Sequence, residues 1–296
     1  MINTPEHTAG KEPLNLERIV TILHEKLPTI TSELIGTSEN IDDPRQQDFM
    51  ADPDNPAYHA LMWHQYGVLT HSEKFRSFIA NKAPDYIKQW GIAEQATAIL
   101  SEKIDGTTKS DLLQIASLVH DLGKFTSRIF QVQPDGTELA RFIDHEAHSG
   151  EIIRHNFKRH LDEFGLTDAQ IEYIAQCAEH HFDLGKVRRV ADANGGYTLE
   201  FARSETFANV AQDIIAAIPE LSLEIGLMFM ADSFSKTQFS AKADTDEGIA
   251  KQKTTLQAEI QAAGAEPLLI NQALQQPVNI EIGRQFLQQW ATFKHV

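Results

Sequence analysis

The stretch Leu118-Val119-His120-Asp121-Leu122-Gly123-Lys124 places a histidine and an aspartate side by side at the end of an apolar run. The run from Leu112 to Val119 has apolar residues at three- and four-residue spacing, which predicts a buried helix. Burying an imidazole beside a carboxylate costs free energy unless a partner compensates both groups. A divalent metal ion is such a partner, because it binds a neutral imidazole nitrogen and a carboxylate oxygen together. The stretch therefore indicates a metal site, with Lys124 one turn further on facing an anion; the alternative is an ordinary helix-end His-Asp pair.

The chain as a whole is long enough for one large domain and is strongly acidic. Of its 296 residues 42% are apolar, and 26 Lys and Arg against 42 Asp and Glu give a net charge of −16. The apolar content supports a real hydrophobic core, while the negative charge disfavours a nucleic-acid partner. Cys177 is the only cysteine, which excludes an intrachain disulfide and a multi-cysteine zinc site.

Residues 1–13 are polar, and we expect them to form a flexible tail. They contain no apolar signal region, and nowhere does the sequence have the run of about 18 apolar residues that a membrane helix needs. We therefore expect a soluble, cytoplasmic protein without a membrane partner.

Helical periodicity dominates the rest of the chain and predicts an all-α fold. The expected helices are 14–34, 58–80, 85–100, 109–121, 145–164, 168–181, 205–218, 221–239, 247–263 and 280–293. Residues 36–56 contain Asp-Pro and Asn-Pro turns and are expected to form a loop. Two small β-hairpins are expected, one in 129–142 and one in 187–201 around Asn194-Gly195-Gly196. We predict a single helical domain, 14–296, with its motifs in about 58–240 and a helical C-terminal extension, 245–296.

Further side chains of the types that bind metals lie on or beside the expected helices. His71 lies within one of them, and Asp232 ends the apolar run Leu227-Met228-Phe229-Met230-Ala231. A carboxylate buried there needs a partner, which is either a metal or a cationic or helix-cap group. His145-Glu146 opens one helix, and Glu179-His180-His181 closes the next. Each histidine taken alone also fits an exposed or hydrogen-bonded role without a metal.

The order of these residues resembles that of the HD-domain superfamily of metal-dependent phosphohydrolases. The sequence His120-Asp121-Leu122-Gly123-Lys124 is similar to the signature of that family. His145-Glu146-Ala147-His148-Ser149-Gly150 resembles its third motif, and Ala231-Asp232-Ser233 resembles its last. The resemblance spans roughly residues 64–232. It implies a compact bundle of helices with the metal at its centre, which agrees with an all-α bundle that carries one or two small β-hairpins.

The resemblance also implies a set of metal ligands. The first ion would be held by His71, His120, Asp121 and Asp232. A second ion would be held by His145 and His180, with Asp121 bridging the two ions and His181 as the alternative to His180. One or two divalent ions are expected, with Fe, Mn, Mg, Ni, Co and Zn as candidates.

The expected reaction is hydrolysis of a nucleotide or another small phosphate ester, at a metal centre built on Asp121. Metal ions would lower the pKa of a bound water and shield the phosphoryl oxygens. Lys124 and Arg128 are candidates to bind the phosphate, or else solvent-facing cations that match a helix dipole. His64 and Glu146 are candidates to carry protons.

Two other functions fit the same ligand types. The His and Asp set also resembles that of di-iron oxygenases such as the inositol-cleaving enzymes, in which two irons activate oxygen. Alternatively, the domain senses a nucleotide and keeps a metal without turning substrate over. The acidic surface favours a small phosphorylated substrate over a large polyanionic partner.

Overall fold

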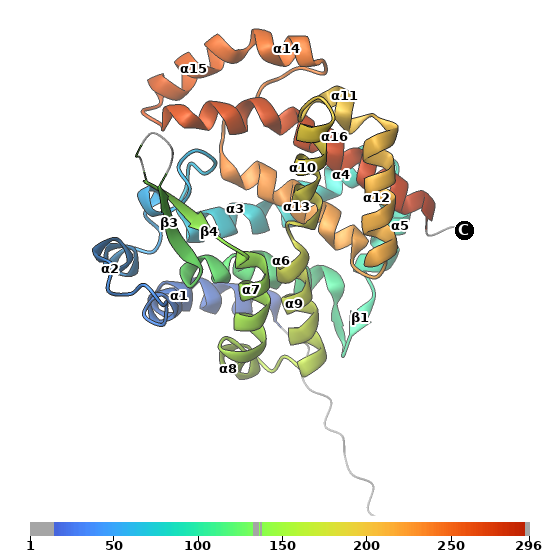
Figure 1. Cartoon of the computed structure of the whole chain (residues 1–296). Helices are drawn as coiled ribbons and strands as arrows, with labels where there is room; N and C mark the ends of the chain where they lie inside the picture. The colour runs from blue at the N-terminus through green and yellow to red at the C-terminus, as the bar shows by residue number, and fades with distance from the viewer. Residues whose placement is uncertain (1–14, 133–135, 137, 294–296) are drawn as a thin grey trace, which may run out of the picture.

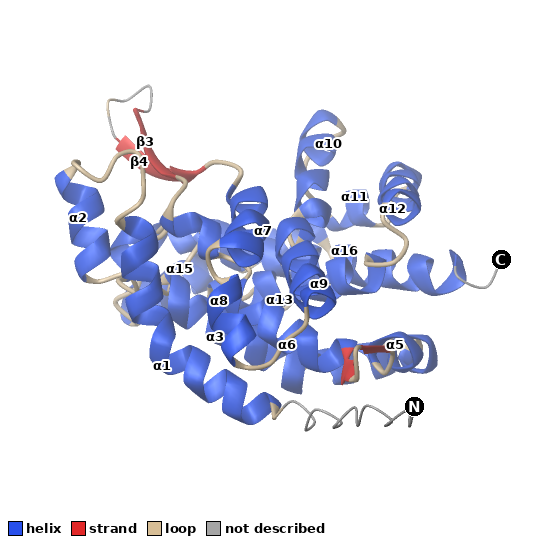
Figure 2. Cartoon of the chain, turned by 90° about the horizontal axis from the view of Figure 1, so that it is seen from below, coloured by secondary structure: helices blue, strands red, loops and turns tan. Residues whose placement is uncertain are grey.

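The computed structural model describes residues 15–132, 136 and 138–293. Helices make up most of this part of the chain, and its strands form two small antiparallel pairs (Figures 1 and 2). The predicted all-α fold with small hairpins is confirmed. The tail expected at 1–13 lies outside the described residues. Among the described helices, none is long and apolar enough to span a membrane.

Five helices surround the middle of the molecule and carry most of the predicted motifs. They are α3 (Val68–Asn81), α6 (Lys109–Val119), α7 (His145–His155), α9 (Asp168–His180) and α13 (Ser222–Lys236). Helix α6 packs between α3 and α9, α7 packs along α9, and α13 packs against α3 and α16 (Ile270–Phe293) (Figure 1). The apolar side of α6, from Leu112 to Val119, is almost completely buried, which is what its spacing predicts.

Side-chain caps explain where two of these helices begin. The Thr108 hydroxyl accepts a hydrogen bond from the Asp111 amide at 3.1 Å and starts α6. At the start of α9, Thr167 and Gln170 form a capping box, in which each side chain bonds the other residue's backbone amide. Such caps satisfy amides that the first helical turn leaves without an internal partner.

The remaining helices surround this group. They are α1 (Leu16–Ile35), α2 (Pro44–Ala51), α4 (Ala83–Gln89), α5 (Ala93–Leu100), α8 (Lys158–Glu163), α10 (Val187–Ala193), α11 (Leu199–Ala202), α12 (Glu205–Ala217), α14 (Asp246–Lys251) and α15 (Lys253–Ala262). Figure 1 shows α14 and α15 at one end of the molecule and α1 and α8 at the other.

One expected hairpin is present, and the other is wrong. Strands β3 (Arg128–Val132) and β4 (Glu138–Phe142) pair antiparallel, with Arg128 opposite Phe142. Residues 187–201 instead form α10 and α11. Gly195 and Gly196 both have positive φ, so the turn signal was correct, but it joins two helices rather than two strands. A further pair, β1 (Lys103–Ile104) with β2 (Thr107–Thr108), has strands too short to show an alternating pattern.

Other boundaries also differ from the prediction, and the expected helices 85–100, 145–164 and 247–263 are each divided into two helices. The expected loop 36–56 contains α2, which begins with Pro44 after an Asp43 cap. The expected helix 58–80 begins only at Val68, so His64 lies in a loop. Helix α16 begins at Ile270 rather than near residue 280 and continues through Pro277, because burial of most of its length compensates the missing hydrogen bond.

An ion-pair network joins α16 to the end of α11. The Glu281 carboxylate accepts from Arg203 and Arg284, each at 3.0 Å, and from Gln285 at 3.1 Å. Burial opposes its ionisation, but these hydrogen bonds outweigh that effect and lower the pKa of Glu281 from 4.5 to about 2. The ionised carboxylate therefore stabilises the folded state.

Glu281→Gln should lower the free energy of unfolding at pH 7 by about 1.5–3 kcal/mol, the range for hydrogen bonds to charged groups. A lowered pKa gives stability that is present above the unfolded value and is lost as the pH falls through the folded value. The difference between wild type and variant should therefore shrink between pH 4.5 and about 2. Denaturant titrations across this range measure it, with the exposed Glu247→Gln as control. A difference independent of pH would contradict the assignment.

Candidate metal centre

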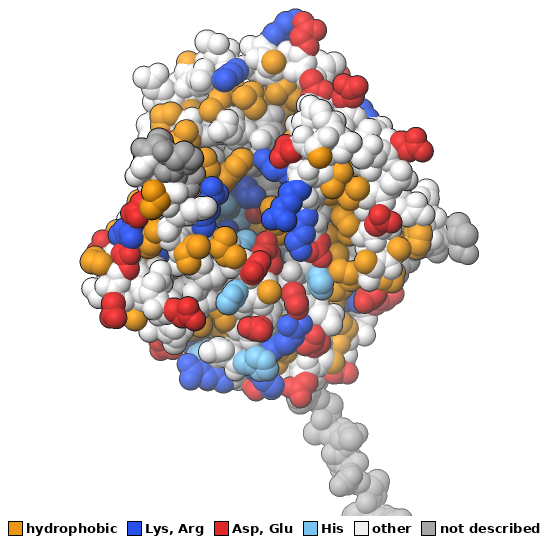
Figure 3. Space-filling model, in the orientation of Figure 1, with side chains coloured by type: hydrophobic (Ala, Val, Ile, Leu, Met, Phe, Trp, Pro, Cys, Tyr) orange, Lys and Arg blue, Asp and Glu red, His pale blue; other side chains and the backbone are white. Residues whose placement is uncertain are grey.

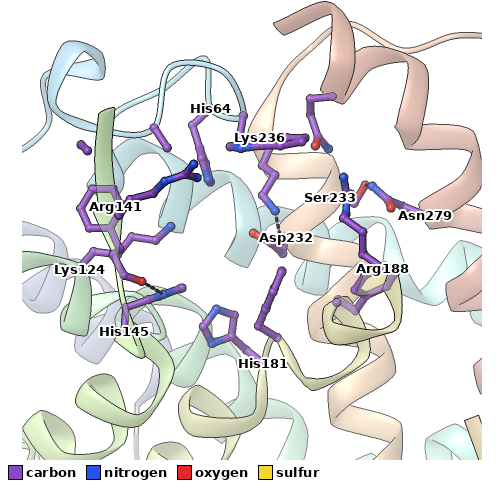
Figure 4. A pocket seen from close by; sticks show the side chains of 18 of the residues that line it. His64, Lys124, Arg141, His145, His181, Arg188, Asp232, Ser233, Lys236 and Asn279 are labelled. Carbon is purple, nitrogen blue, oxygen red and sulfur yellow. Dashed lines mark hydrogen bonds and ion pairs between the residues drawn. The ribbon is translucent and has the colours of Figure 1, made fainter. Parts of the chain in front are cut away.

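Five elements bring the predicted ligand residues to one place. His71 comes from the first turn of α3 and Asp232 from α13, while His120 and Asp121 follow the end of α6. His145 begins α7, and His181 follows the end of α9. Figure 4 shows His145, His181 and Asp232 facing the same cavity. Two groups of side chains could each hold an ion, and both include Asp121. One group adds His71 and His120, and the other adds His145 and His181.

Gly123 allows α7 to approach the His-Asp pair closely. A Cβ atom at this position would lie 2.0 Å from the His145 carbonyl oxygen and 2.7 Å from the Ser149 nitrogen. The Gly123 amide instead donates a hydrogen bond to the Ser149 hydroxyl at 2.8 Å. The glycine of the signature therefore brings His145 beside Asp121, and a larger residue would push the two apart.

The Asp121 carboxylate lies between two pairs of histidines. Its Oδ2 atom is 3.4 Å from His71 Nε2 and 3.3 Å from His120 Nε2. Its Oδ1 atom is 3.4 Å from His145 Nε2 and 3.7 Å from His181 Nε2. Each oxygen thus faces a different pair, as a carboxylate that bridges two ions would.

The other ring nitrogen of three of these histidines faces a backbone carbonyl. The Nδ1 atoms of His120, His145 and His181 lie 2.8, 3.0 and 2.6 Å from the carbonyl oxygen three residues earlier. A carbonyl oxygen only accepts hydrogen bonds, so Nδ1 carries the proton in each ring. In a neutral ring this leaves the Nε2 lone pair facing Asp121.

Burial keeps the rings of His71, His145 and His181 neutral. It lowers the pKa of His71 and His145 below the ordinary value and that of His181 to about 3. Neutral Nε2 lone pairs and carboxylate oxygens are all acceptors, and acceptors do not stabilise one another. Among the described residues, His71 Nε2, His120 Nε2 and Asp121 Oδ1 have no hydrogen-bond partner. Cations between the rings and the carboxylate would satisfy all three atoms, so the residues fit divalent metal ions.

Asp232 adds a second carboxylate to the group around His71. Its Oδ1 atom lies 3.4 Å from His71 Nε2, and its other oxygen forms an ion pair with Lys236. Burial raises the pKa of the Asp232 carboxyl, but the Lys236 charge outweighs this and holds that pKa well below its usual value. An ionised oxygen is therefore available beside His71.

Within the histidine doublet, the structure turns His181 toward Asp121 and His180 away from it. His181 is 2% exposed, whereas the His180 side chain is 29% exposed and its Nδ1 lies 2.7 Å from Asp183 Oδ2. Neighbouring helical residues point about 100° apart, and the contact with Asp183 holds the His180 ring away from the centre. The preference for His180 in the sequence prediction is thus corrected in favour of His181.

The predicted phosphate-binding residues separate in space. Lys124 is buried at the centre, with its Nζ atom 2.7 Å from Asp121 Oδ2 and 3.0 Å from His59 Nε2. Arg128 does not line this cavity: its guanidinium lies over Phe49 at 4.9 Å and donates to the Arg45 carbonyl oxygen at 2.9 Å. The prediction that Arg128 binds the phosphate, or else faces solvent, was wrong. Arg128 begins strand β3 rather than continuing a helix, and its side chain is buried away from the cavity.

The two predicted proton carriers also differ in position. His64 lines the cavity and stacks on His59, with 3.7 Å between the ring centroids. Glu146 does not line the cavity; its Oε2 atom lies 3.4 Å from His145 Nδ1. His59 was missed by the sequence analysis, and its only signal is its place in the histidine-rich stretch before α3.

The cavity over the centre has a volume of about 350 Å³ and a cationic lining. Its Lys and Arg residues are Lys124, Arg141, Arg188 and Lys236. Figure 3 shows Lys and Arg side chains around this hollow, with histidine deeper inside. Arg141, Arg188 and Lys236 were not predicted, because they come from β4, α10 and α13 and show no motif in the sequence.

A protein-family model matches part of the chain. Residues 92–235 match the family model described as HD domain. This span includes His120, Asp121, His145, His181 and Asp232, and it begins after His71. No curated protein matches the chain.

Asp121→Ala should remove the bound metal, because this carboxylate faces both histidine pairs. A ligand that binds only the folded state stabilises it by about 2.7 kcal/mol at one hundred times its Kd. The metal-dependent increase in melting temperature should therefore disappear together with the metal measured by atomic emission. Asp162→Ala, which changes an exposed carboxylate, is the control. Full metal content in the Asp121 variant would refute the site.

The histidine doublet offers a matched pair of variants. His181→Ala should lower the metal content from two ions per chain to one, because His181 faces Asp121 Oδ1. His180→Ala should leave both ions in place, because its imidazole pairs with Asp183. Metal analysis of both proteins purified without chelator decides between them, and equal loss in both variants would contradict the geometry.

Proposed function

Because the chain belongs to the HD-domain superfamily, we propose that it is a metal-dependent phosphohydrolase that acts on a nucleotide or another small phosphate ester. The observation that carries the proposal is the Asp121 carboxylate, whose two oxygens face separate pairs of histidine Nε2 atoms. Divalent ions bound there would supply a water of lowered pKa and would neutralise phosphoryl oxygens.

His71, His120, Asp121 and Asp232 would hold one ion, and Asp121, His145 and His181 would hold the other. The carbonyl oxygens behind His120, His145 and His181 fix these rings in the tautomer that ligation requires. Each ring is therefore oriented before a metal binds, which reduces the entropy cost of assembling the site.

The charges of the cavity support a phosphate ester as substrate. Four cationic side chains line a small cavity in a chain of net charge −16, so the local charge opposes the overall one. Lys124 can donate to a phosphoryl oxygen from beside Asp121, and Lys236 can do so from beside Asp232. The volume of about 350 Å³ lies in the range of small-molecule pockets.

His64 is placed to move a proton within this cavity. Burial lowers its pKa well below the ordinary value, so its ring is neutral at pH 7. Its Nδ1 atom has no hydrogen-bond partner among the described residues. A neutral imidazole with a free nitrogen can take a proton from an attacking water or pass one to a leaving group.

A screen of phosphate esters tests the proposal directly. Protein purified without chelator is analysed for metals and is then assayed for phosphate release from nucleotides and sugar phosphates. We expect release from at least one class, with loss of activity on chelation and recovery on adding metal. Oxygen consumption with a substrate by a di-iron form, without phosphate release, would establish the oxygenase alternative instead.

Lys124→Ala should reduce kcat/KM for the identified ester by about tenfold or more, the loss of one charge-assisted hydrogen bond. Metal content should be retained, because the ligand atoms named above remain. Lys186→Ala, a solvent-exposed lysine paired with Asp183, is the matched control. Unchanged kinetics in the Lys124 variant would limit this lysine to neutralising Asp121.

A further inference from the structure

Arg188 is a charged side chain that the proposed chemistry does not use. It lies in the first turn of α10 and lines the same cavity as His145 and His181. Lys124 and Lys236 each form an ion pair with a carboxylate of the centre, but no carboxylate of the described residues forms one with Arg188. In a chain with 42 acidic residues against 26 basic ones, an arginine left without an acidic partner inside a cavity is available to an anionic ligand.

Two aromatic rings hold the Arg188 guanidinium. Its central carbon lies 4.4 Å from the centroid of the Tyr197 ring and 5.1 Å from that of Trp63. A guanidinium that lies over ring faces can still donate to a ligand from N–H groups at its edge. The side chain is therefore positioned before a ligand binds, unlike a surface arginine that must be ordered by it.

Hydrogen bonds fix one of these rings to the metal centre. The Tyr197 hydroxyl donates to Asn279 Oδ1 on α16, and Asn279 Nδ2 donates to the Ser233 hydroxyl at 2.9 Å. Ser233 directly follows the candidate ligand Asp232 on α13. Burial raises the pKa of Tyr197, so its hydroxyl stays protonated and keeps donating. The position of Arg188 relative to the centre is thus set by three helices.

The opposite side of the cavity carries a second arginine. Figure 4 shows Arg141 and Arg188 on opposite sides of the cavity, with Asp232 between them. Phe142, Ile143, Phe182 and Phe229 also line the cavity. A ligand that fills it meets the metal centre, an apolar lining and a fixed guanidinium.

We propose that Arg188 binds a second anionic group of the substrate, so that the substrate is an organic phosphate with a largely apolar body and a further carboxylate or phosphate. A guanidinium matches either group, because both present two oxygens to its paired N–H donors. This inference rests on the proposed function, which places the phosphoryl group at the metal centre. It adds a requirement that a metal centre alone does not impose.

Phosphonates that cannot be hydrolysed test the second anion without relying on turnover. Isothermal titration calorimetry on the metal-loaded protein compares phenylphosphonate with 4-phosphonobenzoate, and the matching biphenyl pair extends the spacer. We expect at least one carboxylated probe to bind about tenfold more tightly than the matching probe without a carboxylate, as one charge-assisted hydrogen bond would give.

The advantage of the carboxylate should disappear in Arg188→Gln, while binding of the probes without a carboxylate stays within about twofold of wild type. Arg189→Gln, which changes an exposed neighbour outside the cavity, should keep the full advantage. The inference is overturned if no carboxylated probe gains affinity, or if the gain persists without Arg188. Should the gain depend on Arg188 while no ester is hydrolysed, the anion site stands and the phosphohydrolase proposal fails.

Discussion

The structure depends on one buried carboxylate that four histidine nitrogens face at once. Asp121 is 1% exposed, and its two oxygens lie 3.3 to 3.7 Å from the Nε2 atoms of His71, His120, His145 and His181. Without cations, this arrangement of buried acceptors would destabilise the fold. Metal ions bound between the helices that meet at Asp121 would therefore stabilise the fold, which would couple metal binding to folding stability.

The same local hydrogen bond to a backbone carbonyl oxygen orients three of the four histidine rings. His120 and His181 each follow the last residue of a helix, and His145 follows β4. In each case Nδ1 uses the carbonyl oxygen three residues earlier, so the chain before the histidine determines its tautomer. No distant residue is needed for this, and the ring is oriented as soon as the local turn forms. The long-range part of the fold then has only to bring the turns together.

Part of the cavity lining comes from segments outside the residues that match the HD-domain model. The residues that match the HD-domain model, 92–235, supply most of the candidate ligands. Trp63 and His64 come from the loop before α3, and Gln272 and Asn279 come from α16, so part of the cavity lining lies outside the matched span. Changes in these outer segments could alter which substrate the cavity accepts while leaving the metal centre intact.

The sequence alone determined the helical class and the identity of most of the centre. His120-Asp121 after an apolar run, and Asp232 at the end of another, were recognisable because burial of such groups demands a partner, and burial is encoded in local periodicity. It could not choose between His180 and His181, since that depends on how α9 is rotated against α7. It also could not place Arg128 outside the cavity or Arg188 inside it, because both positions result from packing between segments far apart in the chain. Local patterns specify which residues must be buried and paired, whereas only the tertiary structure decides which of them meet.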